Sequence, residues 1–310
     1  MTALSISPDP RPLGKSGLHV FPLAWGMWRF AGVDVRTARA RIDAALEAGI
    51  TLFDTADVYG LDNNCPFGAA EALLGDVLKE SPGLRSKFLL ATKCGIEPGT
   101  PYDSSETYLR KALGASLARM NVESVDLFQI HRPDLAAHPA DLAAALTRLR
   151  AEGKFAHIGV SNHTPSQVAA LQAHLDFPIA TQQPEFSCWA TAPFFDGTLD
   201  QCMERGIGVL AWSPLAGGRL GMTAAQAARE ADGARLVALI AKLDEIAARE
   251  GVTREAVAVA FILAHPAKIV PIIGSQQPAR IARAADALKV NLSRGDWYGI
   301  LQASMGARLP

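Results

Sequence analysis

The sequence lacks the features of a secreted, membrane-spanning or polyanion-binding protein. Its 4 cysteines are widely spaced and form no C-x-x-C pair, which excludes a zinc ribbon and argues against a disulfide framework. The N-terminus has no apolar signal-peptide core, and no run approaches the roughly 18 apolar residues of a membrane helix. Lysine plus arginine number 30 against 31 acidic residues, so no excess charge attracts nucleic acid. We therefore expect a cytoplasmic protein with neither membrane nor nucleic acid as partner.

Several common catalytic motifs are also missing. The 7 histidines include no H-x-H pair, so no metal site is expected. No G-x-S-x-G elbow and no Walker A loop is present, which argues against an acyl-transfer serine and a P-loop. The G-x-G-x-x-G fingerprint is absent too. This excludes a standard Rossmann site but leaves open nicotinamide binding on another scaffold.

The sequence does contain short apolar runs that alternate with longer amphipathic segments. Hydrophobic residues make up 49% of the chain, enough for a sizeable core. Strands are expected over residues 22–25, 50–54, 88–92, 125–130, 157–160, 179–182, 208–212 and 269–272. Helices are expected over residues 35–48, 69–79, 105–120, 139–151, 165–173, 233–250 and 253–264, with another after Ser293. Eight such repeats predict an α/β fold, a (β/α)8 TIM barrel with extra helices.

No linker divides the chain, so we expect one domain over residues 1–310. Two helices exceed the simple repeat: one of the two between the seventh and eighth strands, and the one after Ser293. The Ala-rich segment 223–234 is interpreted as a surface loop with a fraying helix, without an assigned function.

Polar residues stand at the C-terminal ends of the expected strands, where the loops of a parallel barrel converge on its active site. They are Asp54, Lys93, His131, Ser161 with Asn162, Gln183, and Ser213. Taken singly, each has a structural interpretation. Asp54 could cap a turn, His131 could be a structural histidine, and Ser161-Asn162 could cap a helix. Their shared placement at one rim favours a functional site.

The residue types at this rim suit proton donation better than nucleophilic attack. Lys93 follows an apolar strand, where a buried ammonium needs a counter-charge. A tyrosine with a pKa of about 10 releases its proton reluctantly, and a nearby lysine held by an aspartate lowers that pKa. A neutral histidine can orient a carbonyl oxygen. A Tyr, Lys, Asp and His set therefore suits proton donation to an alkoxide.

The motifs that carry these residues resemble those of the aldo-keto reductases, in order across about 260 residues. The closest likeness is to the bacterial branch described as predicted oxidoreductases. The matching segments are RPLGKSGLHVFPLAWGMW from Arg11, the D-T-A-x-x-Y-G motif from Asp54 to Gly60, GAAEALLG at 68–75, ATKCG around Lys93, FQIHRPD around His131, GVSN ending at Asn162, and WSPLAGGR from Trp212 to Arg219.

This resemblance implies an N-terminal β-hairpin ahead of the barrel, and NADPH-dependent reduction of aldehydes or ketones to alcohols. Tyr59 would be the general acid, Lys93 and Asp54 would tune it, and His131 would orient the carbonyl. NADP(H) would be bound by Gly26, Met27, Trp28, Asp54, Ser161, Asn162, Gln183, Trp212, Ser213, Pro214, Leu215, Gly217, Arg219, Gly274, Ser275 and Arg280. Within this set Trp212 would lie under the nicotinamide ring, and Arg280 would bind the 2′-phosphate.

Two departures from the family pattern stand out. Arg283 and Ala284 occupy positions where many relatives carry Glu and Asn, which affects the expected adenine contacts. An insertion over 61–67, which contains Cys65, lengthens the loop beside the pocket. Together with Trp28 and Trp189, this loop suggests an apolar pocket.

Two other functions are compatible with parts of this pattern. One is a non-catalytic nicotinamide-binding sensor or interaction module, since some members of the family are channel-associated subunits. The other is a phosphate-handling barrel isomerase, which would not explain Trp212 and Tyr59 together. The sequence does not reveal the physiological substrate, expected to be a small carbonyl compound, or the oligomeric state.

Overall fold

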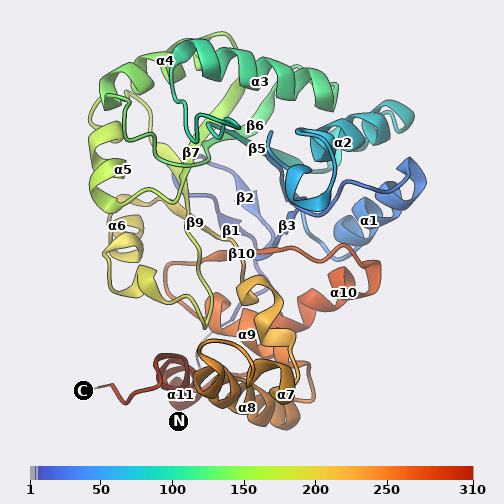
Figure 1. The fold of residues 1–310 in the computed structure, drawn as a ribbon, viewed down its shortest axis with the longest axis vertical. Helices are drawn as coiled ribbons and strands as arrows, with labels where there is room; N and C mark the ends of the chain where they lie inside the picture. Colours follow the sequence, from blue (N-terminus) through green and yellow to red (C-terminus); the bar gives the residue numbers. More distant parts are fainter. Residues whose placement is uncertain (1–3, 5, 310) are drawn as a thin grey trace.

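Eight parallel strands form a closed barrel, which confirms the predicted fold (Figure 1). The computed structural model describes residue 4 and residues 6–309; residues 1–3, 5 and 310 of the predicted domain lie outside the described residues. Neighbouring strands follow chain order, and the last closes the barrel by pairing with the first. The strands are β3 (Ala24–Gly26), β4 (Leu52–Asp54), β5 (Leu89–Cys94), β6 (Val125–Ile130), β7 (Phe155–Ser161), β8 (Ile179–Gln183), β9 (Gly208–Ala211) and β10 (Val270–Ile273).

Every predicted strand is present, but some boundaries differ from the prediction. Residues 22 and 23 precede β3 instead of starting it. Lys93 lies within β5 and not after it, because pairing with β6 continues through Lys93–Gln129 to Cys94–Ile130. Gln183 likewise ends β8, where it pairs with Ser161. The strands therefore carry these polar residues on rigid, hydrogen-bonded backbone.

Helices surround the barrel and begin at the expected capping residues. The side chains of Ser105, Thr253 and Ser293 each accept a hydrogen bond from a first-turn amide. The helix after β7 is capped by Thr164 and not by Ser161 or Asn162. The helices are α1 (Val35–Glu47), α2 (Ala69–Glu80), α3 (Glu106–Met120), α4 (Pro139–Ala151), α5 (Pro165–Gln172), α6 (Thr198–Arg205), α7 (Ala224–Ala227), α8 (Gly233–Glu250), α9 (Arg254–Leu263), α10 (Pro278–Arg283) and α11 (Arg294–Met305).

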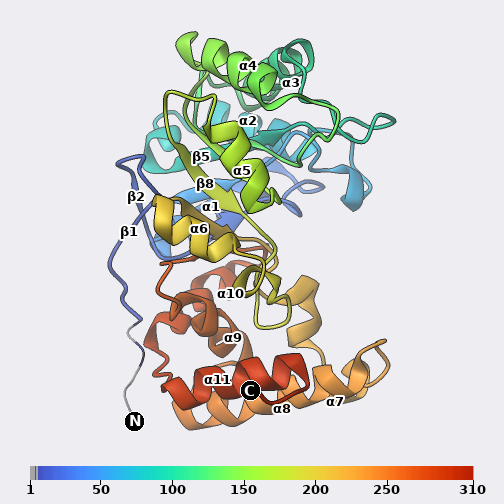
Figure 2. The same cartoon turned by 90° about the vertical axis from the view of Figure 1, so that its left-hand side faces the viewer.

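Helix α11 is one predicted addition to the barrel repeat, and of the two helices between β9 and β10 the structure shows α8 to be the other. They pack against each other at the bottom of both views, outside the ring of barrel helices (Figures 1 and 2). The Ala-rich segment before α8 contains only the four-residue α7, started by a capping box at Thr223. In the part of the chain that the structure describes, no helix combines the length and apolar composition needed to cross a bilayer.

An antiparallel hairpin covers one end of the barrel, as the resemblance implied. It consists of β1 (Arg11–Pro12) and β2 (His19–Val20), seen at the left edge of Figure 2. Gly14 in its turn has a φ of +58°, and a Cβ there would lie 2.2 Å from the carbonyl oxygen of Ala180. Only glycine allows the hairpin to approach the starts of β8 and β9 so closely. This end of the barrel is therefore closed.

The barrel interior changes from apolar to polar along β4, β5 and β6. Leu52, Ala91 and Leu127 belong to a buried apolar cluster near the hairpin. Because side chains alternate between the two faces of a strand, the residue two positions later points to the same interior. Those later residues are Asp54, Lys93 and Gln129, all buried polar groups. The alternation therefore places the polar layer at the end opposite the hairpin.

Candidate active site

Lys93 is the centre of the polar layer. Its ammonium donates to Asp54 Oδ2 at 2.7 Å, to the Thr55 carbonyl oxygen at 2.8 Å and to Tyr59 Oη at 3.0 Å. The side chains of Lys93 and Asp54 are only 0% and 3% exposed. All three ammonium hydrogens are thus used within the protein. The tyrosine oxygen accepts one of them, which leaves the phenolic hydrogen free to point elsewhere.

Charge pairing keeps Lys93 protonated despite its burial. Burial lowers the pKa of Lys93, but Asp54 and Tyr59 together raise it by more than burial lowers it. The net pKa of Lys93 therefore lies above its ordinary value. The expectation of a counter-charge next to Lys93 is confirmed by the contact with Asp54.

Tyr59 differs from the expectation of a lowered pKa. Lys93 does lower the pKa of Tyr59, but burial raises it more and Asp54 adds to the increase, so that the net pKa lies above its ordinary value. The tyrosine is therefore protonated at neutral pH. The structure places it five residues after Asp54, on the loop that leaves β4.

His131 lies on the other side of Tyr59. The two rings are 5.9 Å apart between centroids and nearly perpendicular, with an interplanar angle of 78°. Burial, followed by the nearby charges of Lys93 and Arg132, holds the pKa of His131 well below its ordinary value, so the ring is neutral. Within the described chain, its Nδ1 is buried and has no hydrogen-bond partner. A neutral imidazole carries one N–H donor, which can interact with a bound oxygen atom.

Two glutamines complete the surroundings of Asp54. Its Oδ1 accepts from Gln129 Nε2 at 3.1 Å and from Gln183 Nε2 at 3.0 Å. Gln183 was expected at the nicotinamide, yet its amide nitrogen is shared between Asp54 and Gln129. Gln129 was missed by the sequence analysis, although it is a polar residue in an apolar strand two positions before His131. Side chains alternate between the two faces of a strand, so a residue two positions before His131 shares its face, and this pattern could have identified Gln129.

Ser161, Asn162 and Trp212 form a connected group next to His131. Asn162 Nδ2 donates to Ser161 Oγ at 2.8 Å, and the Trp212 indole donates to Asn162 Oδ1 at 3.0 Å. Asn162 adopts a left-handed backbone with a φ of +58°, which turns its side chain over the rim. The structure thus brings together three residues that the sequence placed at the ends of two strands.

The loop after Trp212 has the backbone of a tight, exposed turn. Gly217 and Gly218 have φ values of +68° and +101°, and nothing lies within 4 Å of where their Cβ atoms would be. Ser213 accepts a hydrogen bond from the Gly217 amide, and Arg219 lies 3.5 Å from Glu230. The loop from Ser213 through Pro214 and Leu215 to Arg219 therefore presents open backbone and a weakly paired cation.

The segment after β10 lies beside the end of β3. The Trp25 indole donates to the Ser275 carbonyl oxygen at 2.9 Å, and Gln276 donates to the Gly26 carbonyl oxygen. Gly274 and Ser275 are thereby fixed next to β3, whereas Arg280 is exposed on α10. Arg283 is exposed as well, and its Nε donates to the Ala279 carbonyl oxygen.

The structure gives Trp28 and Trp189 polar neighbours in addition to the apolar surface that the sequence predicted. The Trp28 indole donates to Asp62 Oδ2 at 3.0 Å, and the Arg29 guanidinium lies 4.6 Å from its ring. Trp189 is covered by the guanidinium of Arg235 at 3.9 Å. Met27 is fully buried. Both tryptophans therefore have polar partners.

A second buried polar cluster behind the rim was missed by the sequence analysis. Asp57 is 0% exposed, and in the described structure neither carboxylate oxygen has a hydrogen-bond partner. Glu71, also buried, accepts from Thr92 and pairs with Arg119 at 2.7 Å. Burial, then Glu71, raises the pKa of Asp57 to about 7. Its position between Asp54 and Tyr59 was the only sequence signal.

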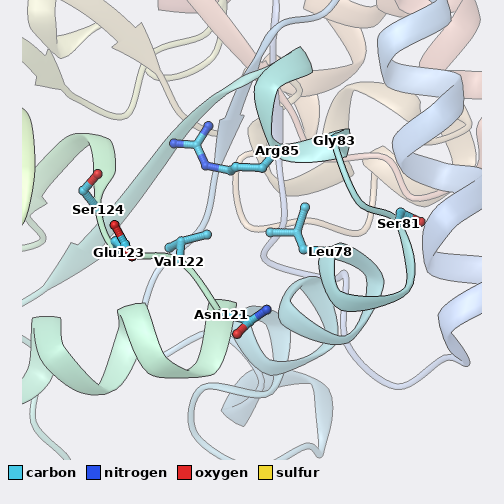
Figure 3. Close-up of a pocket in the computed structure, with 8 residues that line it drawn as sticks. All are labelled: Leu78, Ser81, Gly83, Arg85, Asn121, Val122, Glu123 and Ser124. Atoms are coloured by element: carbon cyan, nitrogen blue, oxygen red, sulfur yellow. The ribbon is translucent and has the colours of Figure 1, made fainter.

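A surface cavity of about 370 Å³ lies at the opposite end of the barrel. It is lined by residues from the end of α2, the segment before β5 and the turn before β6, including Leu78, Ser81 and Asn121 (Figure 3). Its one arginine, Arg85, is bonded to Asp126 and to the Phe88 carbonyl oxygen. Because β5 and β6 start here, the cavity is remote from the ends of the strands where Lys93 and His131 lie.

Comparison with known proteins agrees with this arrangement. Residues 22–303 match the model of the aldo/keto reductase family. The chain is 50% identical over 312 residues, all of both proteins, to the 6-dehydroglucose reductase of Novosphingobium aromaticivorans. It is 37% identical to the 6-dehydroglucose reductase of Agrobacterium fabrum, over 93% of this chain and 96% of that protein.

A solved structure shares the fold at lower sequence identity. It is a thermostable aldo-keto reductase in complex with the inhibitor epalrestat. The TM-score is 0.77 at 22% identity, and the alignment covers 95% of this chain and 99% of that one. This similarity supports the barrel architecture.

Proposed function

Because the chain belongs to the aldo/keto reductase family, and is thus an oxidoreductase, we propose that it uses NADPH to reduce aldehydes or ketones to alcohols. The observation that carries the proposal is the buried ammonium of Lys93, bonded to both Asp54 and Tyr59. It leaves a protonated tyrosine with a free phenolic hydrogen beside the neutral His131.

The roles of the four residues follow from these contacts. When bound, NADPH supplies the hydride that reduces the carbonyl carbon. The N–H group of the neutral His131 ring orients the carbonyl oxygen, which gains negative charge during the reaction. Tyr59 Oη gives its proton to that oxygen, and Lys93 stabilises the tyrosinate that remains. Asp54 keeps Lys93 in place, and solvent returns the proton to Tyr59.

The chemistry of the other residues fits a nicotinamide dinucleotide. We assign the indole of Trp212 to the nicotinamide ring and the amide of Asn162, on which that indole is fixed, to the carboxamide. The open backbone at Gly217 and the cation of Arg219 suit a pyrophosphate. Arg280 on α10 suits a 2′-phosphate, because a guanidinium binds phosphate with paired hydrogen bonds.

The similarity to the two named reductases points to a substrate. We propose 6-dehydroglucose, a glucose with an aldehyde at C6, or a closely related sugar aldehyde. A single domain over residues 1–310, the cytoplasmic location and the choice of NADPH over NADH stay predictions.

The test is the oxidation of NADPH by the purified protein, with a panel of sugar aldehydes, simple aldehydes and ketones. Activity toward at least one aldehyde, lost in Tyr59→Phe, supports the proposal. If NADPH binds but no carbonyl compound is reduced, the chain is a nicotinamide-binding sensor instead. An inactive wild type that does not bind NADPH rejects both functions.

A further inference from the structure

The insertion after Gly60 is folded against the loop that follows β3. A short 3-10 helix, η1 (Leu61–Asn63), starts the insertion. The indole of Trp28 donates to Asp62 Oδ2 at 3.0 Å, and Asn63 Nδ2 donates to the Trp28 carbonyl oxygen at 2.7 Å. Both the side chain and the backbone of Trp28 are thereby bonded to the insertion. The loop has a defined position relative to the aromatic ring.

This pair lies at the same end of the barrel as Tyr59. Trp28 follows the end of β3 by two residues, and β3 pairs with β4 through Gly26–Asp54. The Met27 amide donates to the Asp54 carbonyl oxygen at 2.9 Å, which fixes the chain just before Trp28 to the polar layer. Asp62 follows Tyr59 by only three residues. Trp28 and Asp62 therefore flank the approach to Tyr59 from the β3–β4 side.

The surface of this pair is open to a ligand. The Trp28 side chain is 40% exposed, and Asp62 is exposed. The Arg29 guanidinium lies 4.6 Å from the indole ring. Across the described residues, Asp62 makes no ion pair, and only its Oδ2 is used by the indole. A carboxylate oxygen next to an exposed aromatic ring thus remains available.

These two groups match a molecule with C–H groups and hydroxyl groups on adjacent carbons. Hydroxyl groups donate charge-assisted hydrogen bonds to a carboxylate, and C–H groups pack on an indole. A purely apolar aldehyde offers no donor, so its binding would desolvate the carboxylate without replacing the lost hydrogen bonds. Trp28 and Asp62 together therefore favour polyhydroxylated substrates.

We propose that Asp62, positioned by Trp28, is a specificity-determining residue that selects polyhydroxylated aldehydes over apolar aldehydes. The inference rests on the proposed carbonyl reductase function and assigns to the insertion the recognition of the substrate hydroxyl groups. It does not involve the proton transfer at Tyr59. Its effect should therefore be seen in the choice between substrates.

The test compares kcat/KM for 6-dehydroglucose and for benzaldehyde, with NADPH, in wild type and Asp62→Ala. We expect the ratio of the two values to fall by about tenfold, the equivalent of one hydrogen bond to a charged group, mainly through a higher KM for the sugar aldehyde. Trp28→Phe keeps an aromatic ring but removes the indole donor, so we expect a smaller fall of the same ratio.

A matched control and the possible outcomes separate the inference from the proposed function. Asp76→Ala removes an equally exposed carboxylate from α2, where Asp76 has no ion pair with another described residue, and should leave the ratio unchanged. An unchanged ratio in Asp62→Ala, or equal losses for both aldehydes, overturns the inference while the reductase function stands. A wild-type protein that reduces neither aldehyde overturns both.

Discussion

Asp54 and Asp57 lie three residues apart on one segment, yet their surroundings are opposite. Asp54 accepts hydrogen bonds from Lys93, Gln129 and Gln183. Asp57 is equally buried, but both of its oxygens lack a partner in the described structure. The difference arises because Asp54 faces the barrel interior, whereas Asp57 faces the layer that contains Glu71 and its partner Arg119.

This comparison shows which carboxyl group is charged. Lys93 compensates the charge of Asp54 directly, so the pair is arranged before any ligand binds. The nearest cation to Asp57 is already bonded to Glu71. Burial and the neighbouring Glu71 outweigh the weaker stabilising contacts with the Cys94 thiol and Arg119, so the pKa of Asp57 is raised to about 7. The surroundings of Asp54 thus stabilise its negative charge, whereas the surroundings of Asp57 favour its protonated form.

The largest effect is expected from Lys93→Met, which removes the cation that pairs with Asp54. The change leaves Asp54 buried without its cation and should cost about 3 to 5 kcal/mol of stability. It should also lower kcat by about 10³-fold, within the range of about 10² to 10⁴-fold for acid–base catalysis. Urea unfolding and single-turnover rates measure the two effects.

A double variant separates stability from catalysis at Lys93. Adding Asp54→Asn to Lys93→Met removes the uncompensated charge, so it should restore part of the stability but none of the activity. If Lys93→Met folds and keeps the pH–rate profile of the wild type, Lys93 does not tune Tyr59.

The buried carboxyl group of Asp57 predicts that the stability of the protein depends on pH. The native Asp57 carboxyl keeps its proton up to about pH 7, whereas the unfolded chain releases it near the ordinary pKa of 3.8. The native state therefore binds more protons in this window, and wild-type stability falls as the pH rises from 3.8 through 7. The full loss amounts to about 4 kcal/mol.

Asp57→Asn tests this expectation, because an amide has nearly the same shape and does not ionise. Relative to wild type, the variant should gain about 3 kcal/mol of stability between pH 5 and pH 8, because about two pKa units of the titration window lie between these pH values. Urea unfolding at both pH values gives the difference, and the exposed Asp76→Asn is the control. Parallel pH profiles for wild type and Asp57→Asn would show that Asp57 is already ionised in the native protein.

Tyr59→Phe tests the proton donor that lies next to the charged pair of Lys93 and Asp54. Loss of the phenolic proton should lower the catalytic rate by at least about 10²-fold, while NADPH affinity stays nearly unchanged. Stopped-flow rates and fluorescence titration with NADPH provide the two measurements. Turnover above about a third of the wild-type value, with chemistry rate-limiting, would remove Tyr59 from the mechanism.

The smallest effect concerns the exposed cation on α10, far from either carboxyl group in the sequence. Arg280→Ala should weaken NADPH binding by about 1.5 to 3 kcal/mol, the range for hydrogen bonds to charged groups, with little change for NADH. Arg283→Ala, whose Nε is bonded to a backbone oxygen, is the matched control and should have a smaller effect. Equal losses for both cofactors in Arg280→Ala would contradict the assignment.

The barrel could be predicted from the sequence because its signals are local and repeated. Apolar runs and helix caps such as Ser105 and Ser293 mark most elements within a few residues, although α6 was not among the expected helices. Motif order also brought Asp54, Tyr59 and Lys93 to one rim. Strand ends were less certain, because pairing with a neighbouring strand extends β5 past Lys93.

Contacts between distant segments could not be predicted from the sequence. The partner of Trp28 is an aspartate 34 residues away, which adds a carboxylate beside the expected apolar wall. The net pKa of Tyr59 depends on how far burial outweighs Lys93, and no sequence pattern reports burial at that level. The sequence also does not show that Asp57 lacks a partner. Arg119 pairs with Glu71 instead because helices α2 and α3 pack together in the fold.

The most direct test of the proposed reaction is a single-turnover experiment with NADPH deuterated at nicotinamide C4 on the transferred face, and with 6-dehydroglucose as the aldehyde. The account predicts an alcohol product with one deuterium on the former carbonyl carbon, formed by the wild type and slowed about 10²-fold or more in Tyr59→Phe. Bound NADPH that transfers no deuterium to any aldehyde of the panel would contradict it.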